Sequence, residues 1–215
     1  MEIKISEKET SPENVREFLK IYNDPNKIHL AKEEGGRNIL PGMYLVKILG
    51  DYSDNHLAKL GISQLEINFN KPIFYPKEIS LTYEQKSQNE LNFQFTNGNG
   101  RKYAEGIIGY SHKIDSLQDS SRLDLIMNLG GKLQEGNENG ILNGKKAVYT
   151  YQGMSFLENL PEDLSDLELI IGNPKELTVK EKSKRLRIPT IHAYKNNREN
   201  EKIISQGFAE VEIFG

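Results

Sequence analysis

An aspartate and a histidine lie five residues apart in the segment YNDPNKIHL, which runs from Tyr22 to Leu30. These residues are Asp24 and His29, and the same segment contains Asn26. An Asp and a His that hold one water molecule together can move protons to and from it, which is general acid–base chemistry. Asp-Pro-Asn is also an ordinary turn signal, so a plain surface loop with an exposed histidine is the alternative interpretation.

A second pair with the same spacing, Asp51 and His56, lies toward the end of an expected helix. Five residues at helical spacing place two side chains on different faces, so we interpret this pair as a polar helix end. The other two histidines, His112 and His192, fall in expected strands with no acid beside them, and we interpret both as structural.

Composition excludes several classes of function. The chain of 215 residues has no Cys, which rules out a disulfide scaffold, a thiolate metal site and a Cys nucleophile. Its four His show no ligand spacing, so we expect no metal. The net charge of −3, with one mixed basic run at 180–187, argues against a nucleic-acid partner. No segment has the apolar length of a membrane span or a signal peptide, so we expect a cytoplasmic protein without a membrane partner.

Two expected helices enclose the loop that carries Asp24 and His29. Ser11-Pro12 is a typical helix start, with a capping side chain and Pro at the first helical position. A longer helix is expected near 42–58, after a Pro-Gly pair, and it is apolar on nearly all sides, which predicts burial. Alternating polar and apolar residues then predict strands at 65–74, 79–85, 91–96 and 101–112.

The chain also shows an internal repeat. Ile62–Pro72 reads ISQLEINFNKP and Leu164–Pro174 reads LSDLELIIGNP, at an offset of 102 (164 − 62). Shorter blocks at 38–42 and 140–144, and at 103–109 and 204–210, follow in the same order. The repeat predicts a duplication. The second copy would contain a short helix from Ser120, a long helix near Lys145–Glu158, and strands at 176–181, 185–194 and 202–214.

A long buried helix followed by an antiparallel meander is an α+β unit. A curved sheet wrapped around such a helix is the hotdog arrangement. Two tandem units that pair edge to edge would cover two sheet edges, so we expect a double hotdog with units at residues 1–115 and 116–215.

The loop and the helix after it resemble the MaoC-like (R)-specific enoyl-thioester hydratases. The hallmark of that family is Asp, any residue, Asn, Pro, an apolar residue and His, entered from a short helix. This chain matches the register with Asp24, Asn26, Ile28 and His29. Lys27 stands where the family usually has Pro, and Pro41-Gly42 replaces the family's His-Gly at the start of the buried helix. Pro-Gly there is similar to the β-hydroxyacyl-carrier-protein dehydratases, which share the fold.

The resemblance implies hydration of trans-2-enoyl thioesters, or dehydration of (R)-3-hydroxyacyl thioesters, without a cofactor. It assigns water activation and proton transfer to Asp24 and His29, and orientation of the loop to Asn26. The N–H of Gly42, at a helix N-terminus, would stabilise the negative charge that develops on the thioester oxygen. The matching segment of the second half, residues 130–140, has no His and no Asp. By resemblance to double hotdog hydratases, one half would keep the working site.

Two alternatives remain open. A hotdog acyl thioesterase would need a carboxylate on or near the long helix, where the sequence offers only Asp51 and Asp54 late in the helix. A non-catalytic acyl-binding subunit would instead partner an active hotdog protein. The expected substrate is therefore a thioester of coenzyme A or of acyl carrier protein, and no motif decides between these two carriers. The expected protein partner is a second copy of the chain in a homodimer or a separate hotdog subunit.

Overall fold

The computed structural model describes residues 2–24, 26–29, 38–53, 61–134, 141–142, 145–180, 183–195 and 202–214. Ten strands within these ranges form one antiparallel sheet, in the order β1-β3-β4-β5-β2-β6-β10-β9-β7, with β8 paired to β9 off this path. The strands are β1 (Glu2–Ile5), β2 (Gly61–Phe69), β3 (Ile79–Ser87), β4 (Glu90–Thr96), β5 (Lys102–Ser111), β6 (Ala147–Phe156), β7 (Leu167–Ile171), β8 (Lys175–Lys180), β9 (Ser183–Tyr194) and β10 (Ile203–Phe214).

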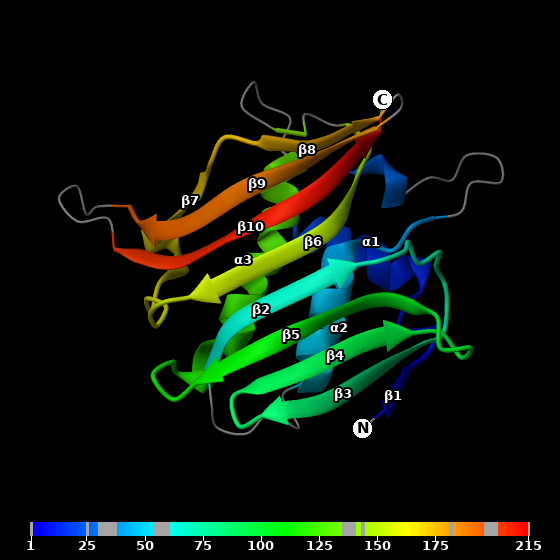
Figure 1. Ribbon diagram of the computed structural model, residues 1–215, viewed down its shortest axis with the longest axis horizontal. Coiled ribbons are helices and arrows are strands. Elements are labelled where there is room, and N and C mark those ends of the chain that lie inside the picture. Colours follow the sequence, from blue (N-terminus) through cyan, green and yellow to red (C-terminus); the bar gives the residue numbers. More distant parts are fainter. Residues whose placement is uncertain are drawn as a thin grey trace.

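The three α-helices of the described ranges lie on one face of this sheet: α1 (Pro12–Ile21), α2 (Gly42–Ser53) and α3 (Asp119–Gln134) (Figure 1). Helices α2 and α3 pack against each other. Short 3-10 turns are η1 (Lys27–His29), η2 (Ser116–Gln118) and η3 (Leu164–Asp166). Because α2 is apolar on nearly all sides, most of it is buried, from Met43 to Leu49 with Lys47 excepted. The α+β hotdog fold expected from the sequence is therefore confirmed. No helix among the described residues has the length and apolar character needed to cross a membrane.

Strands β2 and β6 pair at the centre of the sheet and join the two halves of the chain (Figure 1). Glu66 pairs with Gly153 at the middle of this register. From the centre outward, each half then repeats one strand order: β2-β5-β4-β3 on one side and β6-β10-β9-β7 on the other. Gly106 of β5 and Gly207 of β10 take corresponding places, opposite Ile67 and Met154. This order supports tandem units at residues 1–115 and 116–215, and that division remains a proposal.

The prediction of a helix near Lys145–Glu158 is wrong, because this segment forms the central strand β6. Its β-branched and aromatic residues, from Val148 to Tyr151, fit a pleated surface better than a helix. The long helix of the second half is instead α3, where the sequence pattern predicts only a short helix.

The prediction that the segments repeated at offset 102 occupy equivalent places in the structure is also wrong. Ile62–Pro72 covers most of the central strand β2, whereas Leu164–Pro174 covers η3 and β7 at the end of the sheet. The Gly106/Gly207 correspondence, at offset 101 (207 − 106), does hold in the strand register. The strands expected at 79–85, 91–96, 101–112, 176–181, 185–194 and 202–214 are confirmed within three residues at each end.

Candidate active site

The loop after α1 begins with a fixed reversal of the chain. The N–H of Tyr22 bonds to the carbonyl of Phe18 at 3.0 Å and ends the helix. Asn23 adopts a left-handed conformation with φ 48°, which Asn tolerates better than most residues. The N–H of Asp24 then bonds back to the carbonyl of Leu19 at 3.0 Å. These bonds hold the backbone of Asp24 against the end of α1.

The structure brings Asp24, Asn26 and His29 together. One carboxylate oxygen of Asp24, Oδ1, accepts the N–H of Asn26 at 3.0 Å. The other, Oδ2, lies 3.9 Å from His29 Nε2, and the two side chains are only 9% and 6% exposed. This separation is too long for a direct hydrogen bond, but one water molecule beside the pair can bond to both atoms.

The hydrogen bonds of His29 define which ring nitrogen carries the proton. Nδ1 lies 2.7 Å from the carbonyl oxygen of Ile39, and a carbonyl only accepts, so Nδ1 is the donor. Nε2 of the neutral ring therefore presents its lone pair toward Asp24 and Asn26. Asn26 Nδ2 donates to the carbonyl of Ala147 at 2.7 Å and lies 3.4 Å from Nε2, so this amide connects the ring to β6. Tyr75 donates its hydroxyl to the carbonyl of His29 and holds the backbone.

Burial lowers the pKa of His29, and the negative charge of Asp24 and the bond to the Ile39 carbonyl oppose this effect only in part. A lowered pKa keeps the ring neutral at pH 7. Nε2 of His29 can then accept a proton, with the carboxylate of Asp24 beside it.

Helix α3 of the second half supports the turn that carries Asp24. A Cβ atom at Gly131 would lie 2.2 Å from the carbonyl oxygen of Tyr22 and 2.8 Å from that of Asn23. Only glycine allows the turn to approach the helix this closely. The hydroxyl of Tyr22 also donates to Asp124 of α3 at 2.7 Å.

A cavity of about 260 Å³ is lined by both His29 and Gly42. Asp24 does not line it. Gly42 is the first residue of α2, so its N–H has no partner inside the helix, and a Cβ there would lie 3.0 Å from the ring of Phe69. The cavity wall is mainly apolar and comes from both halves of the chain: Ile28, Ile39, Leu40, Leu45, Phe69, Pro72, Ile73, Val148 and Phe214, with Asn70, Lys71, Tyr149, Thr150 and Glu212 as its other polar members.

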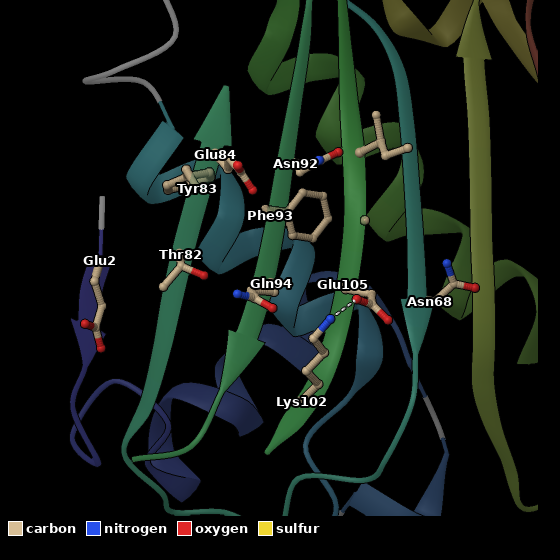
Figure 2. Close-up of a pocket in the computed structure, with 12 residues that line it drawn as sticks. Glu2, Asn68, Thr82, Tyr83, Glu84, Asn92, Phe93, Gln94, Lys102 and Glu105 are labelled. Carbon is tan, nitrogen blue, oxygen red and sulfur yellow. Dashed lines mark hydrogen bonds and ion pairs between the residues drawn. The ribbon is translucent and has the colours of Figure 1, made fainter. Parts of the chain in front are cut away.

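A larger hollow of about 700 Å³ lies on the other face of the sheet, over β3, β4 and β5 (Figure 2). Figure 2 shows polar side chains such as Thr82 and Gln94 pointing outward from the strands, with the helices behind them. Its ion pair, Lys102 with Glu105 at 2.7 Å, is half exposed. No histidine lines this hollow, and its open polar surface offers little apolar area for an acyl chain, so we place the candidate site at the smaller cavity.

The remaining sequence candidates do not join the site. His56 lies outside the described residues, and Asp51 is 53% exposed and pairs with Lys47. His112 is exposed beyond the end of β5, whereas His192 is buried in β9 with Nδ1 2.8 Å from the hydroxyl of Ser205. One residue of the cavity, Tyr149, was missed because its segment was expected to be helical. The polar–apolar pattern of a strand was the only sequence signal that could have found it.

Comparisons with known proteins agree on the fold. No protein-family model and no curated protein matches the chain. A solved structure described as a MaoC-like dehydratase is similar with a TM-score of 0.54 at 8% identity, over 99% of this chain and 97% of that one. The tesB protein of Mycobacterium avium subs paratuberculosis has a TM-score of 0.55 at 9% identity, and the match covers 83% of this chain and 89% of that one. A protein of unknown function with a hot dog fold from Alicyclobacillus acidocaldarius has a TM-score of 0.51 at 8% identity, and the match covers 91% of this chain and 98% of that one. A structure described as a putative thioesterase II from Thermobifida fusca has a TM-score of 0.53 at 9% identity, so the similarity shows the hotdog fold and not one activity.

Replacing Gly131 with Ala should disturb the turn that carries Asp24. The new Cβ meets backbone at 2.2 Å, so either α3 or the turn must move, and we expect a loss of about 1–3 kcal/mol in the free energy of unfolding. Gly130→Ala is the matched control. Its Cβ would meet nothing closer than 3.5 Å, and the better helix propensity of Ala should leave stability equal or raise it by up to about 1 kcal/mol. Urea unfolding measures both, and equal stabilities would contradict the close contact.

The stability of the protein should fall in mild acid because of His29. Its pKa is lowered in the folded protein from an ordinary value of 6.5, so the unfolded chain binds the proton first. The contribution of the neutral buried ring is complete above about pH 6.5 and is lost as the pH falls toward the folded-state pKa. Nitrogen NMR of the imidazole rings, assigned with His29→Gln, should show a midpoint below 6.5. A midpoint at or above 6.5 would mean that the ring is not neutral and buried.

Proposed function

We propose that this protein hydrates trans-2-enoyl thioesters, or dehydrates (R)-3-hydroxyacyl thioesters, at the cavity beside Asp24 and His29. The observation that supports this best is a buried Asp/His pair, 3.9 Å apart, whose histidine lines a mainly apolar cavity together with Gly42 at the N-terminus of α2. Adding water to an enoyl thioester needs these three parts: proton transfer groups, a site for the developing oxyanion, and an apolar site for the chain.

In the hydration direction, one water molecule bonds to Asp24 Oδ2 and His29 Nε2. Its oxygen attacks C3 of the enoyl group as the pair removes a proton, and that proton is delivered to C2. The C2–C3 double bond becomes a single bond, and no group other than water is added. The neutral ring, set by the Nδ1 bond to Ile39, is the form able to accept the proton.

Negative charge develops on the thioester oxygen while C3 is attacked. The N–H of Gly42 would bond to this oxygen, and the dipole of α2 adds to the stabilisation. A side chain at Gly42 would press on Phe69, which lines the same cavity, so glycine keeps the helix end open to the thioester.

The cavity favours a short acyl group. Its volume of about 260 Å³ lies below the 300–1,000 Å³ that is typical of ligand sites in general. The apolar wall gives binding energy in proportion to the area it buries. The carrier would be coenzyme A or acyl carrier protein. One basic and one acidic residue line the cavity, Lys71 and Glu212, and these opposite charges favour neither carrier.

A hotdog acyl thioesterase is the second candidate, because structures described as thioesterases match the fold about as well as the dehydratase does. On α2 the described residues include one carboxylate, Asp51, which is exposed and paired with Lys47. Glu212 lines the cavity, where its carboxylate accepts the hydroxyl of Ser183 at 2.7 Å, and the buried carboxylate beside His29 is Asp24. A thioesterase that used it would direct water at the thioester carbon rather than at C3.

One assay separates these activities. The protein is mixed with crotonyl and longer enoyl thioesters on both carriers, and the enoyl absorbance and the free thiol are followed together. A hydratase removes the enoyl band without releasing thiol, which is the expected result. Thiol release would support the thioesterase, and no reaction on either carrier would favour an acyl-binding subunit.

Removing either member of the pair should abolish most of the turnover. Asp24→Asn and His29→Ala should each lower the hydration rate by about two to four orders of magnitude, the usual effect of a positioned acid or base. Because the two groups act on the same water, the double variant should be little worse than the poorer single variant. Binding of the thioester should change much less, because its chain contacts the apolar wall. Single-turnover kinetics give both quantities.

Asp51→Asn is the matched control, since it makes the same chemical change at an exposed position on α2. It should leave the rate within about twofold, because surface ion pairs contribute little. Losses in the two single variants that simply add in the double variant would contradict action as one unit.

A further inference from the structure

Tyr149 of β6 has a buried hydroxyl with no assigned role. Its oxygen has no hydrogen-bond partner among the described residues. A buried hydroxyl without a partner is costly, so it commonly bonds to an unseen water or to a ligand. The residue lines the cavity that His29 and Gly42 also line.

The hydroxyl lies close to the carboxylate of Asp24. A Cβ at Gly130 of α3 would lie 3.8 Å from the Tyr149 oxygen and 3.9 Å from Asp24 Oδ2. Both oxygens therefore lie within 4 Å of one point beside a residue without a side chain. The Cγ atom of Met43 of α2 lies 3.5 Å from the same point.

Neither Asp24 nor His29 can donate a hydrogen bond to a water molecule that lies between them. Asp24 Oδ2 and His29 Nε2 are both acceptors, so a water between them gives its two hydrogens to them. Its oxygen then still needs a donor. Burial, and then the charge of Asp24, raise the pKa of Tyr149 well above its ordinary value, so this hydroxyl stays protonated and can donate.

We propose that Tyr149, from the second half of the chain, is a further catalytic residue whose hydroxyl donates a hydrogen bond to the water that Asp24 and His29 activate. This inference rests on the proposed function. In the dehydration direction, the same bond is made to the C3 hydroxyl as it leaves. The Tyr149 proton stays on its oxygen throughout, so the atoms balance as they do for water addition alone.

The ring itself is held in place independently of the hydroxyl. It packs edge-on against Phe69 of β2, with ring centroids 6.4 Å apart. The backbone before it is fixed by the bond from Asn26 to Ala147. Tyr149→Phe therefore removes the donor while it keeps the ring contact and the cavity wall.

The kinetic test compares Tyr149→Phe with Tyr151→Phe. Tyr151 lies two residues further along the same strand, outside the cavity lining, and its ring stacks on Phe208 at 4.8 Å. We expect Tyr149→Phe to lower kcat by about 10- to 100-fold, with KM within about threefold and a melting temperature equal to or above that of the wild type. Tyr151→Phe should keep kcat. A Tyr149→Phe variant with full kcat would overturn the inference.

A second measurement does not depend on turnover. A high-resolution crystal structure of the unliganded protein should contain a water within hydrogen-bond distance of the Tyr149 oxygen and of Asp24 or His29, and Tyr149→Phe should lose it. A wild-type site without that water would overturn the inference even if the protein is a hydratase. If the water is present and the wild type hydrates no thioester, the proposed function fails while the water site stands.

Discussion

The close approach of the Tyr22–Asp24 turn to helix α3 is the contact on which the candidate site depends. The carbonyl of Tyr22 occupies the space where Gly131 would carry a side chain. Asp124 of α3 accepts the Tyr22 hydroxyl, and Ala147 of β6 accepts the Asn26 amide. The first half of the chain supplies Asp24 and His29, and the second half holds the loop that carries them.

This division explains why the second half is needed although it lacks an Asp/His pair. Burying a carboxylate and an imidazole costs free energy unless hydrogen bonds compensate for the lost water. In this loop one oxygen of Asp24 accepts the N–H of Asn26, Nδ1 of His29 bonds to Ile39, and the Asn26 amide lies 3.4 Å from Nε2 of His29. The central pairing of β2 with β6 brings the two halves close enough to complete that arrangement.

Local patterns predicted the fold well where the local signal and the tertiary environment agree. The Ser11-Pro12 start, the apolar helix from Gly42 and the alternation of β4 all correspond to observed elements. Strand β6 was mispredicted because the repeat at offset 102 aligned it with the wrong element. The structurally corresponding residues Glu66 and Gly153 share no side-chain chemistry, because a strand position constrains burial on one face and not residue identity.

The candidate site could be predicted only in part from the sequence. Asp24 and His29 have the same spacing as Asp51 and His56, and spacing alone cannot tell a buried pair from a polar helix end. The contacts that bury the first pair come from Ile39 and Ala147, the latter more than a hundred residues away along the chain. The position of Tyr149 depends on strand register, which a single sequence does not reveal.

The orientation of a bound thioester tests the central claim most directly. A crystal structure with a stable (R)-3-hydroxyacyl thioester analogue should place the C3 oxygen within hydrogen-bond distance of His29 Nε2 or Asp24 Oδ2. The thioester oxygen should then bond to the N–H of Gly42. A thioester carbon, rather than C3, beside Asp24 and His29 would contradict the hydratase account, and so would an analogue bound in the polar hollow over β3, β4 and β5.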